Sequence, residues 1–170
     1  YNKLPLDNKM SMRLFDAYLD NLDPARAFLL QADIDRIMPL RKRLDNQLEA
    51  GDVSGGYEIY DVYRKRVVER LEKVIDVLEN DYGSFDFTID ESLYVGEDKS
   101  DWLVSEKAAD ELWRKRIKHS ILNLKVTDKA DDEIQELLIN RFKNRLNQTE
   151  QIQSEDVLEI YINTYCQLLF

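Results

Sequence analysis

The sequence predicts an all-α protein, an irregular bundle of about six helices with one extended or small-hairpin excursion near residues 82–104. Gly and Pro together supply 8 of the 170 residues, whereas they make up roughly 12% of an average soluble protein. Sheet proteins need such residues at hairpins and at strand–helix junctions. Because apolar residues also recur every three or four positions over most of the chain, long helices joined by short links are favoured.

The first third of the chain predicts two helices. Apolar residues at helical spacing cover residues 8–22, and that helix should stop before Pro24, because the residue preceding a proline is forced out of the α region. A second pattern covers residues 34–48. Pro39 interrupts it, so this helix should kink there or restart at the proline. Gly51 then fits the C-terminal cap.

Residues 57–80 form the longest periodic segment and predict a central helix, preceded by a flexible link at residues 54–56. Apolar and polar residues alternate briefly within residues 85–89 and again within residues 93–95. This alternation indicates extended chain or a small hairpin. The part of the chain between residues 80 and 104 is therefore expected to be its least helical part.

Three further helices are expected in the last third. Ser105 is a plausible N-cap for a helix that reaches Leu124, because its hydroxyl can accept from the amides of the first turn. Thr127 or Asp128 should cap the next helix, and residues 154–156 should open the last one. Residues 97–170 contain neither Gly nor Pro, so these helices must end by capping and polarity alone.

The length predicts one domain, residues 1–170, with a single hydrophobic core. The chain starts on Tyr1 rather than Met, and its last residues, 168–170, are apolar and are expected to lie within a helix that runs on. We therefore expect a fragment of a larger protein. The lone cysteine, Cys166, is expected to be a buried small hydrophobic residue rather than a reactive thiol.

Charge and hydropathy exclude several classes of partner. The net charge is −10, and residues 76–101 carry nine acidic side chains against one lysine. No basic field is present to hold nucleic acid, and the short basic runs lie inside predicted helices, where consecutive residues point in different directions. No apolar run is long enough to span a membrane. We expect no nucleic-acid partner and no membrane span.

The residues also argue against catalytic, cofactor and metal sites. One histidine and one cysteine are too few for zinc patterns, and the acidic stretches lack the order of a calcium loop. No glycine-rich phosphate loop or nucleophile motif occurs, and His119 has no nearby Ser, Cys or Asp in sequence. We predict no catalytic residue, no cofactor and no metal. An acidic metal-dependent enzyme remains a much weaker alternative.

One motif stands above the background. Tyr57, Tyr60 and Tyr63 recur every three residues at the start of the central helix. Tyrosine offers a rigid apolar ring with a polar tip, which suits docking of a partner. The alternative, which helical aromatic stripes favour, is the edge of the core with the hydroxyls at its rim.

Taken together, the segments resemble the N-terminal helical domain of the bacterial tail-specific proteases, a family of carboxyl-terminal processing serine peptidases of the periplasm. The resemblance covers nearly the whole chain and rests on the order and spacing of short segments. These segments are Leu6-Asp7-Asn8, residues 14–19, Leu22-Asp23, Leu29-Leu30, Asp33-Ile34, Gly51-Asp52, Arg66, Arg70, Trp102, residues 111–113, residues 122–125, Thr127, residues 132–134, Arg141-Phe142 and residues 154–157.

The resemblance implies a parent enzyme with a PDZ domain and a peptidase core holding a Ser/Lys dyad, both absent from these residues. It implies that this fragment is a non-catalytic scaffold or docking domain in the periplasm. Its partners would be the rest of the same protease chain and, in addition, protein substrates or an adaptor protein. The alternative is a stand-alone helical adaptor that mediates protein–protein interactions, and the coding sequence beyond Phe170 separates the two.

Overall fold

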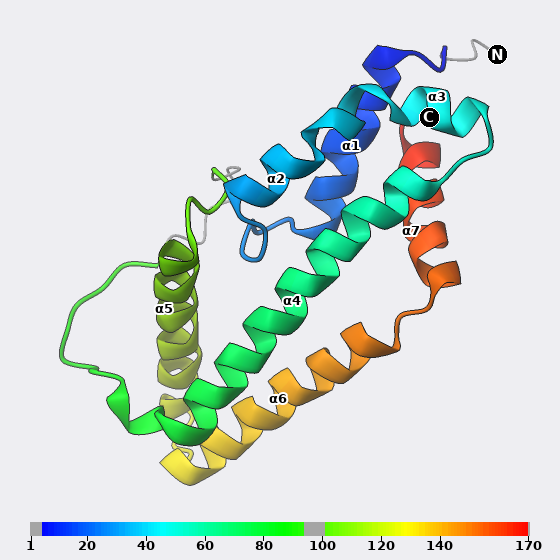
Figure 1. Cartoon of the computed structure of the whole chain (residues 1–170). Helices are drawn as coiled ribbons and strands as arrows, with labels where there is room; N and C mark the ends of the chain where they lie inside the picture. The colour runs from blue at the N-terminus through cyan, green and yellow to red at the C-terminus, as the bar shows by residue number, and fades with distance from the viewer. Residues whose placement is uncertain (1–4, 94–100, 170) are drawn as a thin grey trace.

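The computed structural model describes residues 5–93 and 101–169. It confirms the all-α class, with a long central helix, α4, that runs diagonally through the molecule (Figure 1). The elements are α1 (Asn8–Leu22), α2 (Gln31–Ile37), η1 (Met38–Lys42), α3 (Leu44–Glu49), α4 (Ser54–Asn80), η2 (Tyr82–Ser84), α5 (Glu106–Lys125), α6 (Asp131–Gln151) and α7 (Ser154–Gln167). Helices α1, α3 and α7 surround one half of α4, and α5 and α6 flank the other half.

Helix α1 stops before Pro24, as predicted, at Leu22. The next residue, Asp23, is 1% exposed, and its carboxylate accepts hydrogen bonds from three backbone amides. These are the N–H groups of Ala27 at 2.9 Å, Phe28 at 3.0 Å and Leu29 at 3.0 Å. Since buried amides must be satisfied, this one side chain folds the link between α1 and α2.

The segment predicted as one helix around Pro39 is divided into three. Helix α2 ends at Ile37, a short 3₁₀ helix follows with Pro39 in its first turn, and α3 ends at Glu49. This division accounts for the seven α-helices of the described residues, where about six were expected. Gly51 has φ +72°, the left-handed conformation that glycine tolerates at a helix end, as predicted.

The flexible link expected at residues 54–56 is wrong, because these residues form the first turn of α4, which begins at Ser54. Its two glycines allow close packing rather than flexibility. A Cβ atom on Gly56 would lie 2.6 Å from ring atoms of Tyr161, and one on Gly55 would lie 2.6 Å from Leu44 Cδ2. Only glycine lets α4 approach α7 and α3 this closely.

The buried residues form two clusters along α4, rather than the single core that the length suggested. The first joins α1, α3, α7 and the start of α4 around residues such as Tyr18 and Tyr161. The second joins the end of α4 to α5 and α6 around Trp113. Tyr63 packs against both clusters. One long helix therefore holds together two packed ends.

The excursion after α4 begins with the short 3₁₀ helix η2 and continues without helix or strand to residue 93. Residues 94–100, which carry part of the expected hairpin, lie outside the described residues. Beyond them, Leu103 forms an isolated parallel bridge with Leu30, and its carbonyl accepts the Gln31 N–H at 2.8 Å. Glu91 ties the excursion to α5 through ion pairs with Arg114 and with the buried Lys118, the latter at 2.7 Å.

This tether predicts a dependence of stability on pH. Hydrogen bonds from Arg114 and Lys118 lower the pKa of Glu91 from 4.5 to about 2. A carboxylate whose pKa is lowered by folding stabilises the folded state above its unfolded pKa, and the contribution disappears as pH falls through the folded value. Glu91→Gln should therefore lower the thermal midpoint at pH 7, and the two midpoints should converge from pH 4.5 towards about pH 2. Equal midpoints at pH 7 would contradict the tether.

The last three helices begin close to the expected residues. Ser105 caps α5 by accepting the Ala108 N–H at 3.1 Å, as predicted. The predicted cap of α6 is wrong: Asp128 has φ +58° and lies with Thr127 in the turn that ends α5, and α6 begins at Asp131. Helix α7 begins at Ser154, with Asp156 accepting the Gln153 N–H at 2.8 Å.

The end of α7 differs from the expectation in two ways. The helix ends at Gln167, because the amides of Leu168 and Leu169 bond to carbonyls three residues back and form a turn. Cys166 is exposed rather than buried. It lies on the side of the helix opposite Val157 and Tyr161, which face the core.

Candidate functional site

The tyrosine stripe of α4 lies in three different environments. Tyr60 is only 2% exposed and belongs to the first cluster. Tyr63 is half-buried, with its ring centroid 6.1 Å from that of Phe28 and 5.9 Å from that of Tyr60. Tyr57 is half-buried and donates its hydroxyl to the carbonyl of Ser154 at 3.0 Å. Tyr60 and Tyr63 thus make packing contacts inside the domain, and docking by the stripe stays a prediction.

The buried hydroxyl of Tyr60 has no hydrogen-bond partner among the described residues. A buried polar group without a partner carries a desolvation cost, so its removal should not destabilise the protein. Tyr60→Phe is expected to leave the unfolding free energy unchanged or to raise it by about 1 kcal/mol. Tyr18→Phe is the control, since the Tyr18 hydroxyl donates to the Gly56 carbonyl at 3.3 Å. Denaturant unfolding measures both, and a clear loss for Tyr60→Phe would show a bonded hydroxyl.

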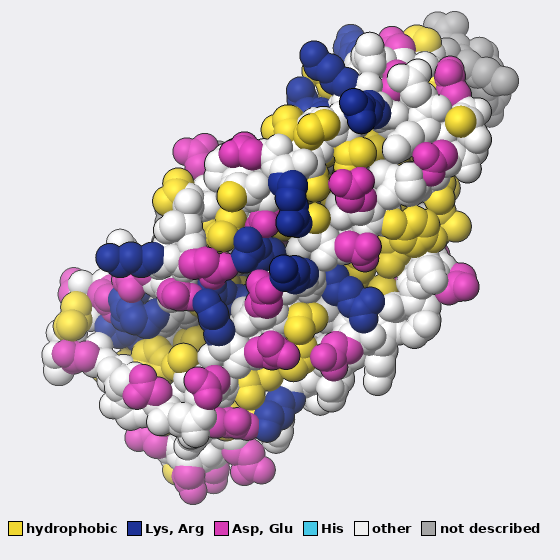
Figure 2. Space-filling model, viewed as in Figure 1, with side chains coloured by type: hydrophobic (Ala, Val, Ile, Leu, Met, Phe, Trp, Pro, Cys, Tyr) yellow, Lys and Arg dark blue, Asp and Glu magenta, His cyan; other side chains and the backbone are white. Residues whose placement is uncertain are grey.

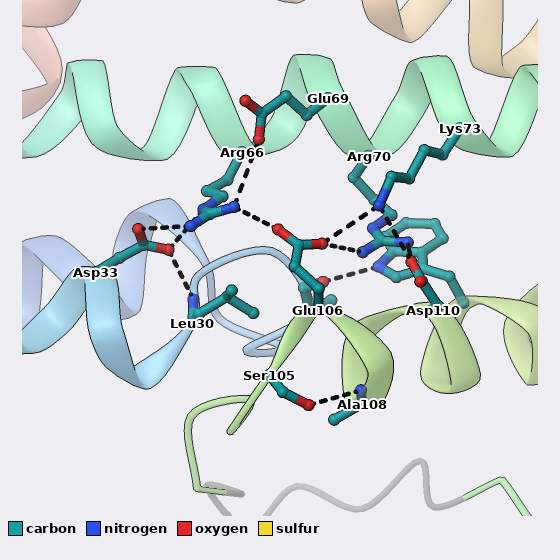
Figure 3. Close-up of polar contacts among 12 residues, drawn as sticks. Leu30, Asp33, Arg66, Glu69, Arg70, Lys73, Ser105, Glu106, Ala108 and Asp110 are labelled. Atoms are coloured by element: carbon teal, nitrogen blue, oxygen red, sulfur yellow. Dashed lines mark hydrogen bonds and ion pairs between the residues drawn. The ribbon is translucent and has the colours of Figure 1, made fainter.

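A charged cluster joins α2, α4 and α5 (Figure 3). Arg66 holds Asp33 by two hydrogen bonds, at 2.7 Å and 3.0 Å, while Asp33 also accepts the Leu30 N–H at 3.0 Å. Paired bonds between a guanidinium and a carboxylate are strong and directional. Arg66 contacts Glu106 of α5 as well. The cluster therefore fixes how α2 and α5 sit on α4.

The second arginine of the cluster is more deeply buried. Arg70 is 7% exposed and donates to Asp110 at 2.6 Å and to Glu106 at 3.3 Å, and Lys73 also contacts both acids. Burial raises the pKa of Asp110, but the hydrogen bond and charge of Arg70 outweigh it, so this pKa lies below its usual value. A carboxyl held ionised in this way is a poor general acid. The arrangement is that of a structural ion network.

Sequence reasoning missed this network. Arg66, Arg70 and Lys73 recur at four and three residues, so they share one face of α4, and this spacing was the available signal. Arg66 belongs to one of the short basic runs, residues 64–66, and its side chain reaches Asp33 and Glu106. The acidic partners come from helices distant in sequence, which the local pattern does not reveal.

The other candidate groups make simple contacts. His119 is exposed, and its Nε2 lies 3.1 Å from the side-chain nitrogen of Asn123. Within residues 5–93 and 101–169, no group of three or more His, Cys, Asp or Glu side chains is arranged to hold a metal ion. In the same residues, no helix is both long and apolar enough to cross a membrane.

An apolar flank remains partly uncovered on α7. It consists of Leu158, Ile162 and Tyr165, all half-buried and spaced at four and three residues beside the buried face of the helix. Hydrophobic side chains gather on the side of the molecule where Figure 1 places α7, as Figure 2 shows. We call these three residues the α7 flank. An apolar stripe next to a buried face is typical of a helix that is covered on two sides.

Comparison with known proteins identifies the family. Residues 1–169 match the family model described as the tail specific protease N-terminal domain. The tail-specific protease of Haemophilus influenzae is 33% identical over 168 residues, which cover 98% of this chain and 24% of that protein. The chain thus spans about a quarter of the length of this relative. It belongs to the family of tail-specific protease N-terminal domains.

Proposed function

We propose that this chain is a non-catalytic scaffold and docking domain of a periplasmic tail-specific protease, a serine enzyme that processes proteins from their C-termini. The α7 flank carries the proposal. Leu158, Ile162 and Tyr165 leave apolar surface uncovered beside the first buried cluster. In the related protease most of the chain lies outside the matching region. The rest of the same chain is the partner that we propose for this surface.

The polar groups support a role without chemistry. The acids of the α4–α5 network are engaged by arginine and lysine, and His119 contacts an asparagine. The purified chain, incubated with an unfolded protein at neutral pH, should show no turnover above buffer. Cleavage that follows this chain through purification would contradict the proposal.

The docking role can be tested at Leu158, which lies on the α7 flank outside the residues that pack against the first cluster. In the longer protease, Leu158→Gln should speed limited proteolysis around this domain, because apolar contact with the rest of the chain is lost. The isolated chain should lose less than about 1 kcal/mol of unfolding free energy. Val126→Gln, at a residue 84% exposed, is the control and should change neither. If Leu158→Gln destabilised the isolated chain as much as it destabilised this domain within the longer protease, docking would be contradicted.

For an adaptor or a protein substrate, the accessible part of the tyrosine stripe is Tyr57. It lines a shallow groove of about 630 Å³ together with Arg36 and Lys65. Glu58 and Asp61 line the groove as well, so it offers charges of both signs beside an aromatic ring that can contact apolar groups of a partner. Substitution of Tyr57 should weaken such binding with the fold intact, whereas loss of folding would support a packing role.

A further inference from the structure

Two arginines near the second buried cluster form no ion pair with the described residues, although the chain has a net charge of −10. Arg116 of α5 is half-buried and Arg145 of α6 is exposed, and neither forms an ion pair within the part of the chain that the structure describes. By contrast, Arg66 and Arg70 are each bonded to carboxylates. The side chains of Arg116 and Arg145 therefore offer positive charge that no ion pair with the described residues neutralises.

Both guanidinium groups lie on aromatic rings. The guanidinium carbon of Arg116 is 4.9 Å from the ring centroid of Trp113, and that of Arg145 is 5.0 Å from Phe28. The rings of Trp113 and Phe28 are themselves 5.2 Å apart, and Phe142 lies 6.3 Å from Trp113. One continuous aromatic cluster thus carries both arginines. Cation–π contact restrains the guanidinium groups and leaves their N–H donors available.

The two helices contribute this pair by the same local pattern. Trp113 precedes Arg116 by three residues on α5, and Phe142 precedes Arg145 by three residues on α6. Residues three apart share one face of a helix. The contact between Trp113 and Phe142 turns these two faces toward each other. Two guanidinium groups are therefore presented where α5 and α6 meet.

The positive charges influence each other across this junction. Burial, and next the charge of Arg145, lower the pKa of Arg116, while Asp23 acts in the opposite sense. The Asp23 oxygens already accept hydrogen bonds from three backbone N–H groups in the link after α1. An added anion would relieve the repulsion between the two arginines.

We propose that Arg116 and Arg145 form a binding site for the carboxylate of an acidic side chain on a peptide segment of another protein. Guanidinium groups match the planar carboxylate through paired N–H donors. The half-buried ring of Phe142, one turn from Arg145, offers apolar contact to a residue next to that carboxylate. Because the rest of the chain is acidic, a segment with an isolated acid beside an apolar residue fits better than a uniformly acidic one. This site is independent of the α7 flank and of the scaffold role.

The test uses the chain and the C-amidated peptide Gly-Phe-Glu-Gly, labelled with fluorescein at its N-terminus, with the Gln peptide labelled in the same way as its match without the side-chain charge. Fluorescence anisotropy should show binding of the Glu peptide that weakens with salt, and at least about tenfold weaker binding of the Gln peptide, since a charge-assisted pair is lost. The double variant Arg116→Gln with Arg145→Gln should bind the Glu peptide at least about tenfold more weakly. Arg13→Gln with Arg43→Gln removes the same charge at exposed positions and should change binding less than about twofold.

Other outcomes would overturn the site. These are absence of binding, equal binding of the Glu and Gln peptides, and equal loss in the control double variant. Inorganic phosphate that displaces the peptide at equal concentration would show a general anion site and not a peptide site. If the first double variant unfolds, Arg145→Gln alone, at an exposed position, should still weaken binding by about threefold or more.

Discussion

Asp23→Ala is expected to destabilise the domain by several kcal/mol of unfolding free energy, at about 3 kcal/mol or more. Asp23 is 1% exposed and accepts the amides of Ala27, Phe28 and Leu29. Each buried donor left without a partner costs about 1–3 kcal/mol. Three of them should therefore remove about 3–9 kcal/mol, a large part of the 5–15 kcal/mol typical of a domain. Urea unfolding followed by circular dichroism measures the loss.

A graded series gives this prediction its control. Asp23→Asn keeps one acceptor oxygen but places an N–H₂ group against a backbone amide. This variant should therefore lose less unfolding free energy than Asp23→Ala, about 2 kcal/mol. Asp7→Ala removes a cap with one bond, to Met10 N at 2.9 Å, at the solvent-facing start of α1 and should cost about 1 kcal/mol. If Asp23→Ala cost no more than Asp7→Ala, the Asp23 carboxylate would not hold the link in solution.

The local pattern of apolar residues and prolines was sufficient to predict most of the helices. The period of apolar residues predicted α1 and α5, because helical periodicity is a property of neighbouring residues. Proline acts on its own neighbours too, so the stop at Leu22 and the break at Pro39 could be predicted. The resemblance to the family, carried by short segments across the chain, is confirmed by the match over residues 1–169.

Features that depend on a distant partner could not be read in this way. Gly56 looks like a turn residue until Tyr161 is seen to lie against it. Arg66 looks solvated until α2 brings Asp33 to it. The division of the buried residues into two clusters follows from how α4 is shared between helices, which periodicity does not specify. Charge and glycine patterns are ambiguous for the same reason, since their meaning is set by tertiary contact.

The second large effect is expected at the contact between α4 and α7. A Cβ atom on Gly56 would lie 2.6 Å from both Cγ and Cδ1 of Tyr161, which is itself 1% exposed and packs on Tyr18 with ring centroids 5.1 Å apart. Such overpacking costs about 1–3 kcal/mol. Alanine favours a helix by about 1 kcal/mol over glycine, so Gly56→Ala should lower the unfolding free energy by a net amount of up to about 2 kcal/mol.

A double-mutant cycle separates steric conflict from other effects of the Gly56 substitution. In a Tyr161→Leu background the ring is gone, so adding Gly56→Ala should cost less than in the parent chain, with a coupling of about 1 kcal/mol or more. Gly83→Ala is the matched control, because nothing lies within 4 Å of the position its Cβ would take. That variant should shift stability by less than about 0.5 kcal/mol. Additive effects of Gly56→Ala and Tyr161→Leu would mean that α4 does not depend on glycine to approach α7.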